Sequence, residues 1–146
     1  MSTSSSTLPD NWKSLPGFAF GDSPEMADEL LSLVLVGTKT ATCSARVEFE
    51  IDGEPLPNEG ERWIVLDGGE TPACIIEINS VEVMPFDAVG EEFAAAEGEG
   101  DLSHEYWSDA HRGYFERQVY GWTEDMLLVC ERFNVIHVFT DQDLKS

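Results

Sequence analysis

Residues 23–50 read SPEMADELLSLVLVGTKTATCSARVEFE, and the hydrophobic period changes in the middle of this stretch. Up to Gly37 the apolar residues recur at the spacing of one helix face. Ser23 is a suitable N-cap, Pro24 fits the first helical position, and Gly37 is a natural helix end. Residues 40–50 alternate and are rich in β-branched side chains, which predicts a strand. A helix therefore leads directly into a strand.

The remaining elements follow from the same kinds of pattern. We predict strands over residues 62–66 and 73–83, one or two strands over 126–139, and helices over about 87–96 and about 101–118, the last capped by Asp101 or Ser103. Strands outnumber helices and do not alternate regularly with them, which disfavours a parallel doubly wound sheet. We therefore expect an α+β fold, a small and mostly antiparallel β-barrel with flanking helices.

The composition describes one acidic domain. The 146 residues include 8 Lys and Arg against 29 Asp and Glu, which gives a net charge of −21 at pH 7. With 42% apolar residues the chain can bury a core, so the charge does not indicate disorder. The charge argues against duplex DNA and anionic membranes as partners, because both attract basic surfaces. No apolar run approaches the roughly 18 residues of a membrane-spanning helix.

The chain ends and the cysteines carry few signals. We expect a flexible Ser/Thr-rich leader over residues 1–16, one domain over 17–140 and a short tail over 141–146. The leader lacks the charged start and apolar core of a signal peptide. The three cysteines are far apart and include no C-x-x-C pair, so a disulfide framework and a zinc knuckle are disfavoured. These features predict a reduced, cytoplasmic protein without a metal or cofactor.

Two segments carry candidate chemistry. Lys39 and Thr42 lie three residues apart where the first helix gives way to a strand, although helix-dipole and strand preferences alone also explain them. A phosphate-binding P-loop is disfavoured, because that loop runs from a strand to a helix. The second segment is the acidic loop 97–101, in which glycines flank Glu99 and allow close backbone approach to a ligand. A solvated loop is the competing interpretation.

The long predicted helix carries two histidines and a group of aromatic residues. His104 and His111 are seven residues apart, about 10.5 Å along a helix, which is too far for both to bind one metal. Aromatic side chains such as Tyr106 and Trp107 are expected mainly in the core. One or two of them at the rim of a pocket would stack on a base.

The run Gly37-x-Lys39-x-x-Thr42 resembles the signature of the ASCH domain family. Further blocks are similar to the bacterial YhfF-like subgroup of that family, and they lie at residues 20–24, 65–68, 96–101, 106–115 and 129–133. The resemblance covers about residues 18–139. It implies a PUA-like fold, in which a small β-barrel has flanking helices and a cleft beside the helix-to-strand turn.

The resemblance also implies a choice of functions. RNA binding is inferred across the family, some members resemble single-strand ribonucleases, and small bacterial members hydrolyse the N4-acyl amide of acetylated cytidine. In those amidohydrolases the catalytic set is a Lys, a Thr three residues later and a Glu of the acidic loop, which match Lys39, Thr42 and Glu99. The fuller signature has an Arg where this chain has Ser44, and Arg46 follows two residues later.

We therefore expect a small hydrolase acting on an N4-acylcytidine-type nucleoside or a related amide. Thr42 would be the nucleophile, Lys39 its base or a charged stabiliser, and Glu99 the acid for the leaving amine. The expected substrate contacts are Arg46, Glu97, Tyr106 and Trp107. The alternatives are a protein that binds or cleaves short single-stranded RNA, and a non-enzymatic nucleotide-binding regulator.

Overall fold

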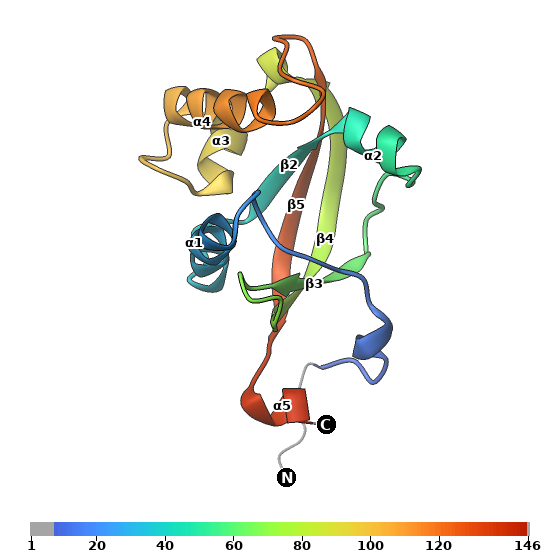
Figure 1. Cartoon of the computed structure of the whole chain (residues 1–146). Coiled ribbons are helices and arrows are strands. Elements are labelled where there is room, and N and C mark those ends of the chain that lie inside the picture. The colour runs from blue at the N-terminus through green and yellow to red at the C-terminus, as the bar shows by residue number, and fades with distance from the viewer. Residues whose placement is uncertain (1–7, 146) are drawn as a thin grey trace.

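The computed structural model describes residues 8–145 and is built around one five-stranded sheet (Figure 1). The strand order is β1-β3-β4-β5-β2, with β1 parallel to β3 and the other neighbours antiparallel. The bounds are Gly17–Phe18 for β1, Ala41–Ala45 for β2, Arg62–Leu66 for β3, Pro72–Pro85 for β4 and Leu127–Val138 for β5. The expected α+β fold with a mostly antiparallel sheet is confirmed.

The expected closed barrel is not confirmed. Strands β1 and β2 stand at the two ends of the strand order, and no pairing joins them within residues 8–145. Closure needs a continuous ladder around the ring. Because β1 has two residues and β2 has five, neither end offers a long edge for closing the ring. The sheet is therefore open.

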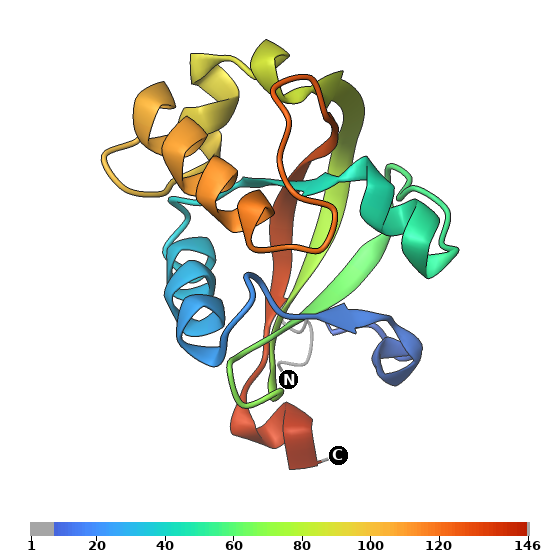
Figure 2. The ribbon, with the colours of Figure 1, turned by 45° about the horizontal axis from the view of Figure 1, so that its top comes forward.

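The helices are α1 (Pro24–Leu35), α2 (Arg46–Asp52), α3 (Glu91–Glu97), α4 (His104–Glu116) and α5 (Asp141–Lys145). In both views α1, α3 and α4 lie on one side of the strands, α2 lies on the other side, and α5 lies beyond one end of the sheet (Figure 2). Both views show α3 and α4 side by side near one end of the sheet, and β2 running from the end of α1 to the start of α2. No helix within the described part of the chain is long and apolar enough to cross a bilayer. Short 3-10 turns lie at Trp12–Ser14 and Phe86–Ala88.

Helix α1 forms as the sequence predicts. The Ser23 hydroxyl accepts a hydrogen bond from the Met26 amide at 3.1 Å, and Pro24 occupies the first turn. Leu31 and Val34 are among its buried residues, so one apolar face packs on the sheet.

The strand predicted over residues 40–50 is wrong beyond Ala45, where helix α2 begins. Strand β2 pairs with β5 only as far as Ala45 opposite Leu128, and β5 starts one residue earlier, at Leu127. The chain beyond Ala45 has almost no partner strand left, so its backbone groups pair within a helix instead. Gly53 ends that helix in the left-handed conformation, with φ of 67°.

The core consists of two apolar clusters on opposite faces of the sheet. Leu128 and Cys130 belong to one cluster and Phe133 to the other, as the alternation of side chains along β5 requires. The first cluster contains Phe93 of α3 and Trp107 of α4. The second contains residues of α1, β3 and β4. The candidate site lies where α3 meets the turn between α1 and β2.

The predicted leader falls partly outside the described residues. Residues 1–7 are not described, whereas Trp12 contacts Phe139 of the domain with ring centroids 4.9 Å apart. The expected domain boundaries stay predictions.

Candidate active site

The turn between α1 and β2 fixes the position of Lys39. Gly37 adopts φ of 86°, and the amides of Thr38 and Lys39 both donate to the Leu33 carbonyl, at 3.0 and 3.1 Å. These bonds hold the backbone against the end of α1. The Lys39 side chain is directed inward, and the residue is only 2% exposed.

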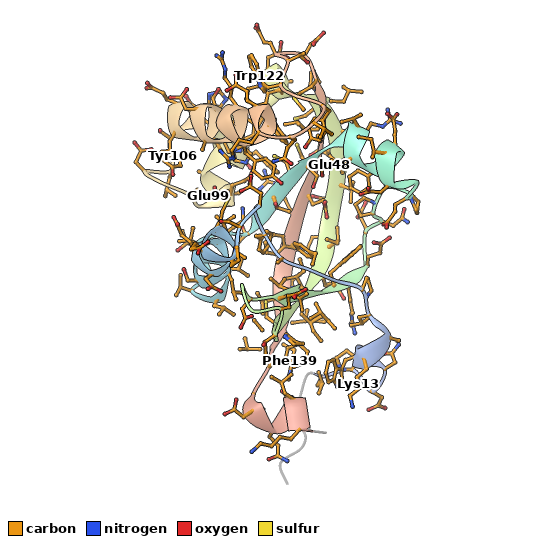
Figure 3. All side chains as sticks on the ribbon, viewed as in Figure 1. Lys13, Glu48, Glu99, Tyr106, Trp122 and Phe139 are labelled. Atoms are coloured by element: carbon orange, nitrogen blue, oxygen red, sulfur yellow. The ribbon has the colours of Figure 1, made fainter. Side chains whose placement is uncertain are left out.

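Gly98 brings the end of α3 against this turn. Its φ is 73°, and a Cβ atom there would lie 2.4 Å from the Thr38 carbonyl oxygen, so only glycine allows the approach. The Thr40 amide donates to the Ala96 carbonyl at 2.7 Å and fastens the two segments. Glu97 and Glu99, on either side of Gly98, thereby reach Lys39, and Figure 3 shows Glu99 at the end of α3 nearest α1.

The Lys39 ammonium is surrounded by oxygen acceptors. Its Nζ atom lies 3.1 Å from Glu97 Oε1, 3.0 Å from Glu99 Oε2 and 2.9 Å from the Ala41 carbonyl oxygen. Burial lowers the pKa of Lys39, but the carboxylates of Glu97 and Glu99 outweigh burial and raise it above its ordinary value. Lys39 is therefore a charged donor at neutral pH.

Glu97 is held by groups of the protein itself. Its Oε2 atom accepts a 2.6 Å hydrogen bond from Trp107 Nε1 and lies 3.2 Å from His111 Nε2. Burial raises the pKa of Glu97, but Lys39 and His111 reverse the effect and lower it to about 2. Burial lowers the pKa of His111, but the Glu97 carboxylate outweighs burial and raises that pKa above its ordinary value. Glu97 is thus an ionised anchor for Lys39.

A cavity of about 390 Å³ opens in front of these groups. Lys39, Thr42 and Glu99 contribute to its wall. Within residues 8–145 the Thr42 hydroxyl makes no hydrogen bond, so it is available to a ligand. The rest of the wall combines further carboxylates with aromatic side chains, namely Phe18, Phe20, Phe49, Trp63 and Tyr114.

Comparison with known families identifies this architecture. The model of the ASCH domain matches residues 17–137. The chain belongs to the ASCH domain family. Protein EF3133 of Enterococcus faecalis V583 is 39% identical, with 88% of this chain and 80% of that chain covered and a TM-score of 0.80. The ASCH domain of Lactobacillus crispatus JV V101 is 38% identical, with 84% and 80% covered and a TM-score of 0.78.

More remote structures share the fold alone. The ASCH protein of Zymomonas mobilis is 16% identical, with 90% of this chain and 75% of that chain covered and a TM-score of 0.50. Comparison with curated proteins returned no match. The ASCH resemblance that the Gly37-x-Lys39-x-x-Thr42 run indicated is therefore confirmed at the level of the family.

This ASCH domain brings together some of the residues that the sequence singled out. Lys39, Thr42, Glu97 and Glu99 all line the one cavity. The described wall of that cavity does not include Arg46, Tyr106 or Trp107.

Each of these three residues has a different place. Arg46 is exposed at the start of α2. Tyr106 is 43% exposed and its ring covers Gly100, and Figure 3 shows it on the outer side of the α3–α4 pair. Trp107 is buried in the core, where its indole orients Glu97. Direct contact of any of them with a substrate stays a prediction.

Sequence reasoning did not single out Glu131. This residue lies on β5 directly opposite Thr42 of β2, is 9% exposed and lines the same cavity. Burial, with the Glu61 carboxylate adding to it, raises the pKa of Glu131 to about 7. The sequence did carry a signal, because Glu131 interrupts an apolar run in a predicted strand.

One cluster has the spacing of a metal site. The donor atoms of Cys43, Glu97 and His111 all lie within 4.8 Å of one another, and such a set suits zinc. However, Lys39 and Trp107 already occupy both oxygens of Glu97. Burial and the neighbouring Glu97 also raise the pKa of the Cys43 thiol well above its ordinary value, which keeps it protonated. We therefore assign the cluster to the hydrogen-bond network around Glu97.

Proposed function

We propose that this ASCH domain hydrolyses an acyl amide on a small nucleoside-like molecule, of the N4-acylcytidine type. The observation that carries the proposal is the convergence of a charged Lys39 and an unbonded Thr42 hydroxyl on one cavity. A hydroxyl beside a fixed cation suits acyl transfer, in which a nucleophile attacks a carbonyl and an oxyanion develops.

The residues divide the chemistry between them. Thr42 Oγ1 attacks the acyl carbon, and the Lys39 ammonium stabilises the negative charge that develops on the carbonyl oxygen. Glu99 is the carboxylate that a ligand reaches, because its side chain is 14% exposed whereas that of Glu97 is 1% exposed. The leaving amine takes its proton from the Lys39–Glu99 pair. A charged Lys39 does not take the proton of Thr42.

The charge of the cavity favours a nucleoside over an RNA strand. Among the described residues its wall includes six glutamates but only Lys39 and His111 as cations, and Glu97 contacts both. RNA affinity depends on cations that are available to phosphates. Four arginines of the domain are instead paired with carboxylates, namely Arg62, Arg112, Arg117 and Arg132. The aromatic wall offers faces on which a base stacks.

Hydrolysis of N4-acetylcytidine and longer N4-acyl cytidines, followed by absorbance, tests the proposal. We expect turnover by the wild type and at least a 100-fold loss in Lys39→Met and Thr42→Val. Lys145→Met, which removes an exposed lysine of α5, is the matched control and should keep full activity. If the wild type turns over none of these compounds, the proposal is wrong; thermal stabilisation without turnover would then favour a binding protein.

A further inference from the structure

The proposed reaction needs an acceptor for the Thr42 proton, and Glu131 stands next to it. Thr42 and Glu131 are directly opposite each other in the antiparallel pair formed by β2 and β5. Residues so paired project from the same face of a sheet, with Cβ atoms about 4.5–5.5 Å apart. Both side chains line the cavity.

Glu131 also differs from the other buried carboxylate of the site. Glu97 is fully engaged by Lys39, Trp107 and His111. Within residues 8–145 the Glu131 carboxyl forms neither a hydrogen bond nor an ion pair, although the residue is nine-tenths buried. The carboxyl oxygens of Glu131 are not among the fully buried atoms without a partner in the described chain, so they remain accessible from the cavity and free to bond a ligand or a water there.

The surroundings bring the pKa of Glu131 close to neutral pH. Burial raises its pKa to about 7, and Glu61, which precedes β3, acts in the same direction. The other cavity carboxylates are Glu48 on α2, Glu54 after it, and Glu97 and Glu99 at the end of α3. The cations Lys39 and His111 are held by Glu97, and burial raises the pKa of both Cys43 and Tyr114, so these two stay uncharged. A base that titrates near the working pH is the most effective kind.

We propose that Glu131 is the general base of this site and removes the proton of Thr42, directly or through one water. This inference rests on the proposed hydrolysis. In the first step the bond from Thr42 Oγ1 to the acyl carbon forms, its proton passes to Glu131, and the C–N bond breaks as the amine takes a proton from the Lys39–Glu99 pair. In the second step water adds to the acyl carbon and gives one proton to that pair, the bond from the acyl carbon to Thr42 Oγ1 breaks, and the carboxylic acid leaves. Glu131 returns its own proton to the Thr42 oxygen.

Acetylation of Thr42 by p-nitrophenyl acetate isolates the base step, because p-nitrophenolate leaves without needing a proton. The acetylated peptide is quantified by mass spectrometry from pH 5.5 to 8.5. For the wild type we expect a rate that rises with pH around a midpoint near 7. Glu131→Gln should lower the rate at pH 8 about 100-fold and remove the midpoint. Glu82→Gln, which changes an exposed glutamate of β4, should behave as the wild type.

A second measurement needs no reaction. Carbon-13 NMR of the glutamate carboxyls should show one resonance that titrates near pH 7 in the wild type and is missing from Glu131→Gln. The inference is overturned if Glu131→Gln acetylates Thr42 at the wild-type rate, if Thr42 is not acetylated in the wild type, or if every glutamate titrates below pH 5.5.

These outcomes separate the inference from the proposed function. Acetylation of Thr42 with the Glu131 midpoint, but without turnover of any N4-acyl cytidine, supports the base and rejects the substrate. Turnover of N4-acetylcytidine without acetylation of Thr42 supports the hydrolase and rejects the base.

Discussion

Lys39 Nζ lies 3.1 Å from Glu97 Oε1, and both side chains are almost completely removed from solvent. The pair joins the turn after α1 to the end of α3, two segments that are far apart in the sequence. A buried ion pair is tolerated when further hydrogen bonds satisfy both partners. Here the Ala41 carbonyl and Glu99 complete the shell of Lys39, while Trp107 and His111 complete that of Glu97.

Replacement of Lys39 by methionine should strongly destabilise the fold. The change removes the Lys39 cation from the buried Glu97 carboxylate and the largely buried Glu99 carboxylate, which costs about 3–5 kcal/mol. Urea denaturation at pH 7 measures the loss. The double variant Lys39→Met with Glu97→Gln should recover much of the lost unfolding free energy. Equal stability of Lys39→Met and the wild type would contradict a buried Lys39–Glu97 ion pair.

Replacement of Trp107 by phenylalanine should cost about 1.5–3 kcal/mol, because a hydrogen bond to a buried carboxylate is lost. The smaller ring keeps most of the contact with His111, whose centroid lies 4.5 Å from that of Trp107. Trp122→Phe is the matched control, since Trp122 Nε1 is buried without a hydrogen bond in the described chain. In urea denaturation Trp107→Phe should lose more unfolding free energy than Trp122→Phe. Similar losses would mean that the hydrogen bond from Trp107 to Glu97 contributes little to stability.

The parts of the site that the sequence predicted are those fixed by local interactions. The cap at Ser23, the end of α1 and the Lys39 turn depend on neighbours within a few residues, and they formed as expected. The switch from strand to helix at Ala45 depends instead on where β5 begins, far along the chain. A local alternating pattern carries no information about the end of a partner strand.

The same distinction between local and long-range interactions explains why the sequence did not single out Glu131. The proximity of Glu131 to Thr42 is a consequence of strand register, which no spacing within either segment reveals. The sequence did place Glu99 in the acidic loop as a candidate acid. It did not predict that Glu97 binds the same ammonium, because that depends on the close approach of Gly98 to Thr38.

Substitution of Gly98 by alanine should push α3 away from the Lys39 turn. The added methyl group would lie 2.4 Å from the Thr38 carbonyl oxygen, in addition to the strain of φ at 73°. Gly53→Ala is the control, because Gly53 has a similar φ of 67° but open space around it, so it should lose only about 1–2 kcal/mol. Gly98→Ala should lose clearly more stability in urea denaturation. Equal losses of stability in Gly98→Ala and Gly53→Ala would show that the close approach of Gly98 to Thr38 adds nothing to the cost of the substitution.

Removal of the Glu131 charge should stabilise the protein at high pH. The pKa of this carboxyl is raised from 4.5 to about 7 in the fold, so ionisation opposes folding. The penalty is absent below about pH 4.5, where the group is protonated in both states, and it is complete above pH 7. The rise of the Glu131 pKa from 4.5 to about 7 corresponds to a penalty of about 3 kcal/mol in the free energy of unfolding.

Glu131→Gln should therefore match the wild type in unfolding free energy near pH 4.5 and exceed it increasingly up to pH 8. Urea denaturation at a series of pH values measures the difference, and Glu82→Gln, at an exposed position, should give a curve parallel to the wild type. A constant difference between Glu131→Gln and the wild type would mean that Glu131 titrates as an ordinary glutamate. The base proposed for Thr42 would then already be ionised far below neutral pH, too weak to accept the proton efficiently.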